Sequence, residues 1–198
     1  MTFEEVLQAR KSVRSYIDKA VEEEKLHAIL DAANLAPSWK NSQTARCYVA
    51  TGETLRRVRE ALPAFNQRNT EHAPVLIIST FVAGIAGYDI KTGEPSNEFG
   101  NGWGACDCGL HDMVLLLKAS ELGLSTLVMG IRDAGKLREI LSIPEEEQVV
   151  SVIAVGYAAA DPVRPARKPT QERVRYFDCS ISCDTQKAPP VWAARIIV

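Results

Sequence analysis

The sequence predicts one α/β domain in which helices and strands alternate along the chain. The chain has 198 residues, 46% of them hydrophobic, which is enough to bury one substantial core without disulfides or a structural metal. Residues 75–80 form a continuous apolar run of the kind found in strands buried on both faces. Residues 105–122 show helical periodicity, with Leu110, Val114 and Leu117 on one face, and are expected to form the central helix.

The first part of the chain predicts two helices joined by an extended segment. Residues 2–5 have the spacing of a capping box and begin a short helix that ends near Arg10. Residues 12–16 follow as an extended piece. From Val21, acidic residues in the first turn and a regular apolar stripe predict an amphipathic helix that is stopped by Pro37.

The rest of the chain continues the alternation. The pattern predicts, in chain order, a strand at 47–51, a helix at 53–62, a strand at 125–129, a helix capped by Asp133 and running through Leu141, and a strand at 149–155. A glycine-rich connection, residues 84–104, joins the buried strand to the central helix. Residues 86–101 and those after Phe177 are the candidates for low order.

Composition limits the classes of partner. A net charge of −2 and a pI near 6.0 argue against a nucleic acid or an anionic membrane surface, since either favours a basic protein. The acidic N-terminus and the absence of a long apolar run predict a cytoplasmic protein with no membrane span. Five scattered cysteines are interpreted as mostly free thiols, and neither they nor the three histidines have the spacing of a metal site.

A basic and hydroxyl-bearing cluster follows the first helix. Arg10, Lys11, Ser12 and Arg14 stand where the helix gives way to extended chain. Because extended residues alternate sides, Arg10, Ser12 and Arg14 can converge on one anion, and guanidinium groups are suited to bidentate phosphate contacts. The alternative is an ordinary helix C-terminus, where cations are favoured by the helix dipole.

A second candidate segment is the polar loop that follows Pro37. It contains Ser38, Trp39, Asn41 and Gln43. Proline, serine and asparagine all favour turns, so taken alone the segment could be an ordinary loop between a helix and a strand.

The two segments together, in this order and at this spacing, resemble the nitroreductase family of FMN-dependent NAD(P)H oxidoreductases. The resemblance implies that Arg10, Lys11 and Ser12 hold the FMN phosphate or ribityl chain. It also implies that Arg14 lies near the N1/O2 edge of the flavin, where a cation stabilises the anionic reduced form. The chain departs from the family pattern at Thr44 and Ala45, where many members have proline and tryptophan.

The same resemblance assigns the loop to the flavin of the partner subunit. Pro37, Ser38, Asn41 and Gln43 are carried over as cofactor contacts. Trp39 is a further candidate, either as a wall of the substrate pocket or as ordinary packing.

Later segments complete the implied site. Asn66 is expected at the pyrimidine edge of the flavin, although its neighbourhood also suits a helix-ending turn. The main chain of Met129 and Gly130, at the end of a strand, is expected near flavin N5, and glycine permits close approach. Arg167 and Lys168 resemble the basic pair that returns to the phosphate, although basic residues between prolines also occur in linkers.

The resemblance implies an α+β fold, a three-layer α/β/α sandwich with a mixed, mainly antiparallel sheet and FMN at the interface of a homodimer. It covers residues 1–170, and residues 171–198 are expected to be an extension that wraps the partner or is disordered. The implied reaction is ping-pong hydride transfer from NADH or NADPH, through flavin N5, to a small electron-poor acceptor such as a nitroaromatic or a quinone.

Two alternatives stay open. The same scaffold could support another flavin reaction, such as dehalogenation, dehydrogenation of a small metabolite or flavin reduction. The chain could also be a non-catalytic flavin-binding protein.

Overall fold

The computed structural model describes residues 1–177. By internal contacts the chain divides into two compact units, Met1–Pro162 and a second unit that begins at Val163. Within the described part of the second unit, the regular element is a short 3-10 helix, Thr170–Glu172. The expected low order after Phe177 lies outside the described residues, and the expected domain boundary at residue 170 stays a prediction.

The first unit is built around a four-stranded sheet. Its strands are β1 (Ala45–Ala50), β2 (Val75–Val82), β3 (Ser125–Met129) and β4 (Glu147–Gly156), in the order β1-β2-β4-β3. These neighbours pair antiparallel, and the parallel contribution is an isolated bridge between Ser12 and Thr126. The predicted α+β class with a mainly antiparallel sheet is confirmed.

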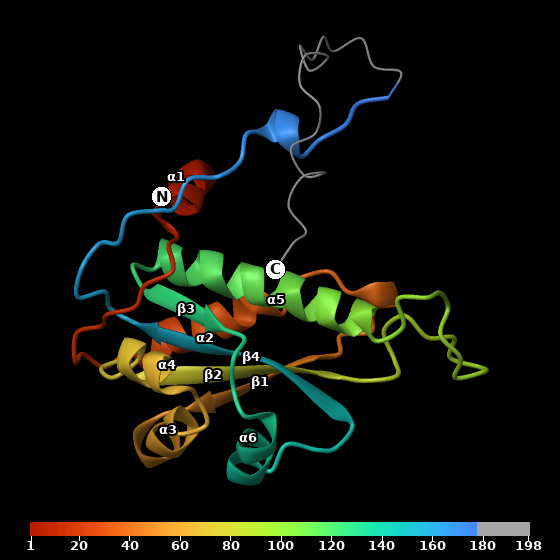
Figure 1. Cartoon of the computed structure of the whole chain (residues 1–198), viewed down its shortest axis with the longest axis horizontal. Coiled ribbons are helices and arrows are strands. Elements are labelled where there is room, and N and C mark those ends of the chain that lie inside the picture. The colour runs from red at the N-terminus through yellow and green to blue at the C-terminus, as the bar shows by residue number, and fades with distance from the viewer. Residues whose placement is uncertain (178–198) are drawn as a thin grey trace, which may run out of the picture. The chain divides into compact units, whose positions relative to one another are not determined.

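The helices of the first unit are α1 (Phe3–Ala9), α2 (Glu23–Ala33), α3 (Gly52–Arg59), α4 (Ala64–Asn69), α5 (Gly102–Glu121) and α6 (Ala134–Leu141), with a short 3-10 helix η1 (Trp39–Asn41). Helices α2 and α5 cover one face of the sheet, and α3 and α6 lie on the other (Figure 1). Among residues 1–177, none of these helices is long and apolar enough to cross a membrane.

Successive side chains of the central strand β2 point to opposite faces of the sheet, so the strand packs against a layer of helices on each side. Ile77 of β2 packs in one core cluster with Ile29 of α2 and Leu115 of α5, whereas the next residue, Ile78, packs in the other cluster with Val58 of α3. These side chains are fully buried. Because both faces of β2 are covered by helices, the strand is apolar on every residue from Val75 to Ile78, as the sequence predicted.

Most predicted elements are present with shifted ends. Thr2 forms the predicted capping box with Glu5, and Asp133 caps α6 by accepting a hydrogen bond from the backbone N–H of Lys136. Helix α2 ends at Ala33, four residues before Pro37, because Pro37 has no N–H to donate to the Ala33 carbonyl and its ring would clash with that carbonyl. Helix α4 was not predicted as a helix, since it has only 6 residues and a composition typical of turns.

Candidate functional site

The predicted basic and hydroxyl cluster runs beside β3. Ser12 forms the isolated bridge with Thr126, and the backbone N–H of Val13 donates to the carbonyl of Thr126 at 3.0 Å. Val13 is 4% exposed and belongs to the core, whereas Ser12 and Arg14 are exposed. The predicted alternation is present, so the hydroxyl and the guanidinium lie on the outer side of the segment.

Arg10 and Lys11 are arranged differently from those two residues. Arg10 is the C-terminal cap of α1 and donates its backbone N–H to Val6 at 2.9 Å. The Lys11 ammonium lies 2.7 and 2.8 Å from the two carboxylate oxygens of Asp161. This ion pair ties the cluster to the chain that follows β4 and partly neutralises Lys11, so Arg14 is the more available cation for a ligand.

The end of β3 presents backbone to open space. Met129 is 3% exposed and packs in the core, but its neighbours Val128 and Ile131 are 45% and 65% exposed. A Cβ atom added to Gly130 would meet no other atom within 4 Å. A planar ligand could therefore approach the main chain at Gly130 closely and cover the two apolar side chains beside it.

The Pro-Ser loop after α2 has a costly backbone conformation. Lys40, Asn41 and Gln43 have φ angles of 46°, 56° and 50°, in the left-handed region that costs a residue with a Cβ roughly 1–2 kcal/mol. Two hydrogen bonds, one within the loop and one from β1, support this shape in part. The backbone N–H of Gln43 donates to the Ser38 hydroxyl at 3.0 Å, and the Arg46 guanidinium donates to the Gln43 carbonyl at 2.8 Å.

Helix α5 contributes the other contacts of the loop. The Asp107 carboxylate, which is 5% exposed, accepts hydrogen bonds from the backbone N–H of Trp39 at 2.9 Å and from the Ser42 hydroxyl at 3.4 Å. The indole of Trp39 packs on that of Trp103, with ring centroids 4.7 Å apart. Phe99 packs edge-on against Trp103 at 5.5 Å. The loop is thus anchored to the first turns of α5 by both a carboxylate and an aromatic pair.

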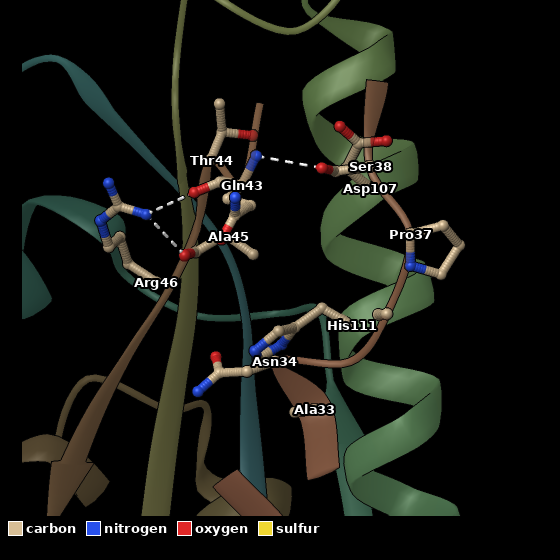
Figure 2. A pocket seen from close by; sticks show the side chains of 11 residues that line it. Ala33, Asn34, Pro37, Ser38, Gln43, Thr44, Ala45, Arg46, Asp107 and His111 are labelled. Atoms are coloured by element: carbon tan, nitrogen blue, oxygen red, sulfur yellow. Dashed lines mark hydrogen bonds between the residues drawn. The ribbon is translucent and has the colours of Figure 1, made fainter. Parts of the chain in front are cut away.

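A cavity of about 160 Å³ lies behind this loop. Figure 2 shows it between the end of α2, the loop, the start of β1 and α5, with Ser38 and Gln43 on the loop side and Asp107 and His111 on the helix side. Arg46 adds a cation at the start of β1. The lining mixes polar side chains with apolar surface from alanine and proline residues, as is common in sites for small ligands.

The two predicted motifs lie at opposite ends of α5. The Pro-Ser loop contacts Asp107 near the helix start, whereas the Ser12 segment contacts Thr126, just after the helix ends at Glu121. Asp107 and Glu121 are 14 residues apart in this helix, which at 1.5 Å per residue corresponds to about 21 Å. One chain does not bring its two motifs together.

The outer face of α5 is apolar and exposed. Leu110 and Met113 are 43% and 39% exposed, and Cys106 is exposed one turn before Leu110. The helix turns Leu115 and Ala119 toward the core instead. The face predicted from Leu110, Val114 and Leu117 is therefore not the core face of this chain, and it is available to a partner.

The remaining predicted residues lie elsewhere. Asn66 is 6% exposed in α4, where its side-chain oxygen accepts a hydrogen bond from the Asn69 amide at 3.5 Å. Arg167 and Lys168 are exposed in the second unit, and the Arg167 guanidinium donates to the Pro165 carbonyl at 2.9 Å. Their roles at a cofactor stay predictions.

The sequence reasoning did not identify the buried polar side of α5. Asp112 accepts a hydrogen bond from the Ser79 hydroxyl at 2.8 Å, and His111 lies 3.5 Å from the same carboxylate oxygen. Asp107 and His111, like Cys108 and Asp112, are spaced i, i+4 in an otherwise apolar helix, and that signal could have found them. Burial raises the pKa of the Cys108 thiol to about 12, so it is no nucleophile near neutral pH. Within the described residues, no group of three or more His, Cys, Asp or Glu could hold a metal ion.

Comparison with known proteins identifies a family. The model of the nitroreductase family matches residues 7–157. A protein of Methanothermobacter thermautotrophicus with the provisional name NADH dehydrogenase/NAD(P)H nitroreductase is 32% identical over 80% of this chain and 78% of its own. An FMN reductase [NAD(P)H] of Bacillus subtilis is 29% identical over 88% of this chain and 72% of its own.

A solved structure supports the same assignment. A nitroreductase family protein of Clostridium difficile, 26% identical, superposes with a TM-score of 0.74 over 89% of this chain and 98% of its own. The match of the family model to most of the first unit, together with this similarity, shows that the chain belongs to the nitroreductase family.

Proposed function

We propose that the chain is an FMN-dependent oxidoreductase that uses NADH or NADPH and acts as a homodimer. Membership of the nitroreductase family supports this proposal, as do relatives whose names include NAD(P)H nitroreductase and FMN reductase. When bound, FMN would supply hydride transfer through N5, and the protein would bind the cofactor, orient it and adjust its charge.

The surface beside β3 fits such a ligand. FMN combines an anionic phosphate with a largely apolar ring system. Exposed Ser12 and Arg14 supply a hydroxyl and a cation for the polar part, and exposed Val128 and Ile131 supply apolar surface beside the open backbone of Gly130. Arg10 and Lys11 would help to hold the phosphate, and Arg14 would stabilise negative charge at the pyrimidine edge of the ring.

The observation that carries the homodimer is the separation of the two motifs along α5. About 21 Å of helix separates the residue of α5 that anchors the Pro-Ser loop from the end of α5 beside the Ser12 segment, which favours completion of each site by the loop of a second chain. In a two-fold dimer, the loop of one chain would complete the site of the other. The exposed stripe of Cys106, Leu110 and Met113 on α5 would then be covered by the partner.

The acceptor is proposed to be a small electron-poor molecule such as a nitroaromatic or a quinone. Trp39, Trp103 and Phe99 form an aromatic cluster next to the loop, and planar acceptors stack well on such rings. Another flavin reaction on the same scaffold is the second candidate, since Thr44 and Ala45 depart from the common family pattern at this place.

Anaerobic mixing tests the proposal. We expect the purified protein to carry or take up FMN, NADH or NADPH to bleach the oxidised flavin band, and a nitroaromatic or quinone to restore it. Protein that takes up no FMN would refute the whole proposal. Bound flavin that dithionite bleaches but neither nicotinamide does would instead identify a non-catalytic flavin-binding protein.

A further inference from the structure

The shape of the Pro-Ser loop requires support from outside the loop. Lys40, Asn41 and Gln43 all have left-handed backbone geometry, although none of them is glycine. Such a cluster of unfavourable conformations persists only where surrounding contacts determine it, and it commonly marks a site of function.

Asp107 bridges the two sides of the left-handed pair. One carboxylate oxygen, Oδ2, accepts a hydrogen bond from the backbone N–H of Trp39, which precedes Lys40 and Asn41, and another from the hydroxyl of Ser42, which follows them. The carboxylate is 5% exposed, so these bonds compete little with water. Asp107 is also fixed on a long helix, and it therefore offers the loop a rigid attachment.

Trp103 provides a second attachment from the same face of α5. It precedes Asp107 by four residues, so the two side chains are neighbours on the helix surface. The 4.7 Å packing of Trp103 on Trp39 therefore places the indole of Trp39 and its backbone N–H under the control of adjacent helical residues.

We propose that Asp107 is a positioning residue for the cofactor: by bridging Trp39 and Ser42 it holds the Pro-Ser loop in the left-handed conformation that flavin contact requires. The flavin part of this inference rests on the proposed function. Asp107 itself faces the inner side of the loop and lines the cavity behind it (Figure 2). It acts on the cofactor through the loop and not by direct contact.

The test compares three variants with the full-length parent. Asp107→Ala removes both hydrogen bonds, whereas Asp107→Asn keeps an oxygen that can accept them and removes only the charge. Asp112→Ala is the matched control, because it removes another buried carboxylate of α5 that contacts Ser79 of β2 and not the loop. The thermal midpoint of each apoprotein measures the purely structural cost.

Two readouts report on the loop and on the cofactor separately. The packed indoles of Trp39 and Trp103 should give an exciton couplet in the circular dichroism of the apoprotein, assigned by its loss in Trp39→Phe. Flavin fluorescence quenching gives the dissociation constant of FMN. We expect Asp107→Ala to lose the couplet and bind FMN at least about ten-fold more weakly, the loss typical of a charge-assisted hydrogen bond, with Asp107→Asn between it and the parent.

The outcomes separate the inference from the function on which it rests. If Asp107→Ala keeps the couplet and the FMN affinity of the parent, and only its thermal midpoint falls as in Asp112→Ala, the residue is structural and the inference is wrong. If Asp107→Ala does not fold, Ser42→Ala takes its place, because it removes one of the two bonds from the loop side, and a Ser42→Ala variant equal to the parent in both readouts also overturns the inference. A parent protein that binds no FMN refutes the proposed function and the flavin role, while the couplet still decides whether Asp107 sets the loop.

Discussion

Each flavin site is expected to take its two motifs from different chains, and subunit mixing tests this directly. Arg14→Glu reverses the exposed cation beside β3, and Ser38→Ala removes the hydroxyl that accepts the Gln43 N–H at 3.0 Å. Each variant alone should form dimers in which both sites are defective. This expectation rests on the separation of the two motifs by about 21 Å along α5.

The magnitude follows from counting sites. Random reassociation of equal amounts of the two variants gives about half heterodimers, and each heterodimer has one site with both motifs intact and one site with both defects. About a quarter of all sites should therefore regain the FMN affinity of the parent. Titration of the mixture with FMN, monitored by flavin fluorescence, measures that fraction, and each variant reassociated with itself is the control.

The refuting result is equally concrete. If native mass spectrometry shows heterodimers but no site regains the affinity of the parent, the two motifs do not meet across the interface. The shared-site geometry would then be wrong, although the family assignment would stand.

Three further predictions concern the exposed stripe of α5, the core beneath that helix and the hydrogen bond between Tyr157 and Glu22. Leu110→Glu should convert the dimer to monomers that lose FMN, because it places a charge in the exposed apolar stripe of α5. The control Ile90→Glu, at a residue that is 89% exposed, should leave both the oligomeric state and the FMN affinity unchanged. Sedimentation and flavin titration measure the two properties, and a Leu110→Glu protein that remains dimeric would exclude the stripe as the interface. Leu115→Ala should lower the free energy of unfolding by about 2–5 kcal/mol, because this side chain of α5 is fully buried against the sheet. Denaturant titration measures the loss, and a value near zero would contradict that packing. The Tyr157 hydroxyl donates a hydrogen bond to Glu22 and lowers the pKa of the Glu22 carboxyl to about 2. This hydrogen bond should therefore contribute fully to stability above the ordinary carboxyl pKa of 4.5, and the contribution should disappear as the pH falls toward 2. Tyr157→Phe should return the pKa toward 4.5 in an NMR titration, and an unchanged value would assign the shift to another group.

The fold could be predicted from sequence where local pattern and tertiary environment agree. The apolar run at the start of β2 forms a strand because both of its faces are covered, and Thr2 and Asp133 cap helices because their oxygens satisfy free N–H groups. Helix α4 was not foreseen because the local preference of its Asn-rich sequence is for a turn.

The candidate site was predictable as residue types but not as geometry. The R-x-S-x-R pattern predicted that Ser12 and Arg14 face one side of the segment and Val13 the other, and their exposure and burial agree, since period-two alternation is a local property of extended chain. The distance between this segment and the Pro-Ser loop depends on the path of α5 through the fold. The contact of Asp107 with Trp39 likewise joins residues far apart in sequence, and no spacing rule indicates it.

In helix α5, carboxylates are buried and apolar side chains are exposed, which is unfavourable for an isolated chain. Its inner side buries Asp107 and Asp112, and its outer side exposes Leu110 and Met113. Burying carboxylates is costly unless they accept hydrogen bonds, and exposing an apolar stripe forgoes the gain from burying it. Both features are consistent with one arrangement. In that arrangement the inner carboxylates fix the loop and the sheet, and the outer stripe would pack against a second chain whose β3 edge the same loop would reach. Because the loop and the stripe belong to a single rigid helix, dimer formation itself would set the position of the loop over the partner's site. Cofactor binding would accordingly stabilise the dimer by mass action, since FMN would bind only where both chains are present.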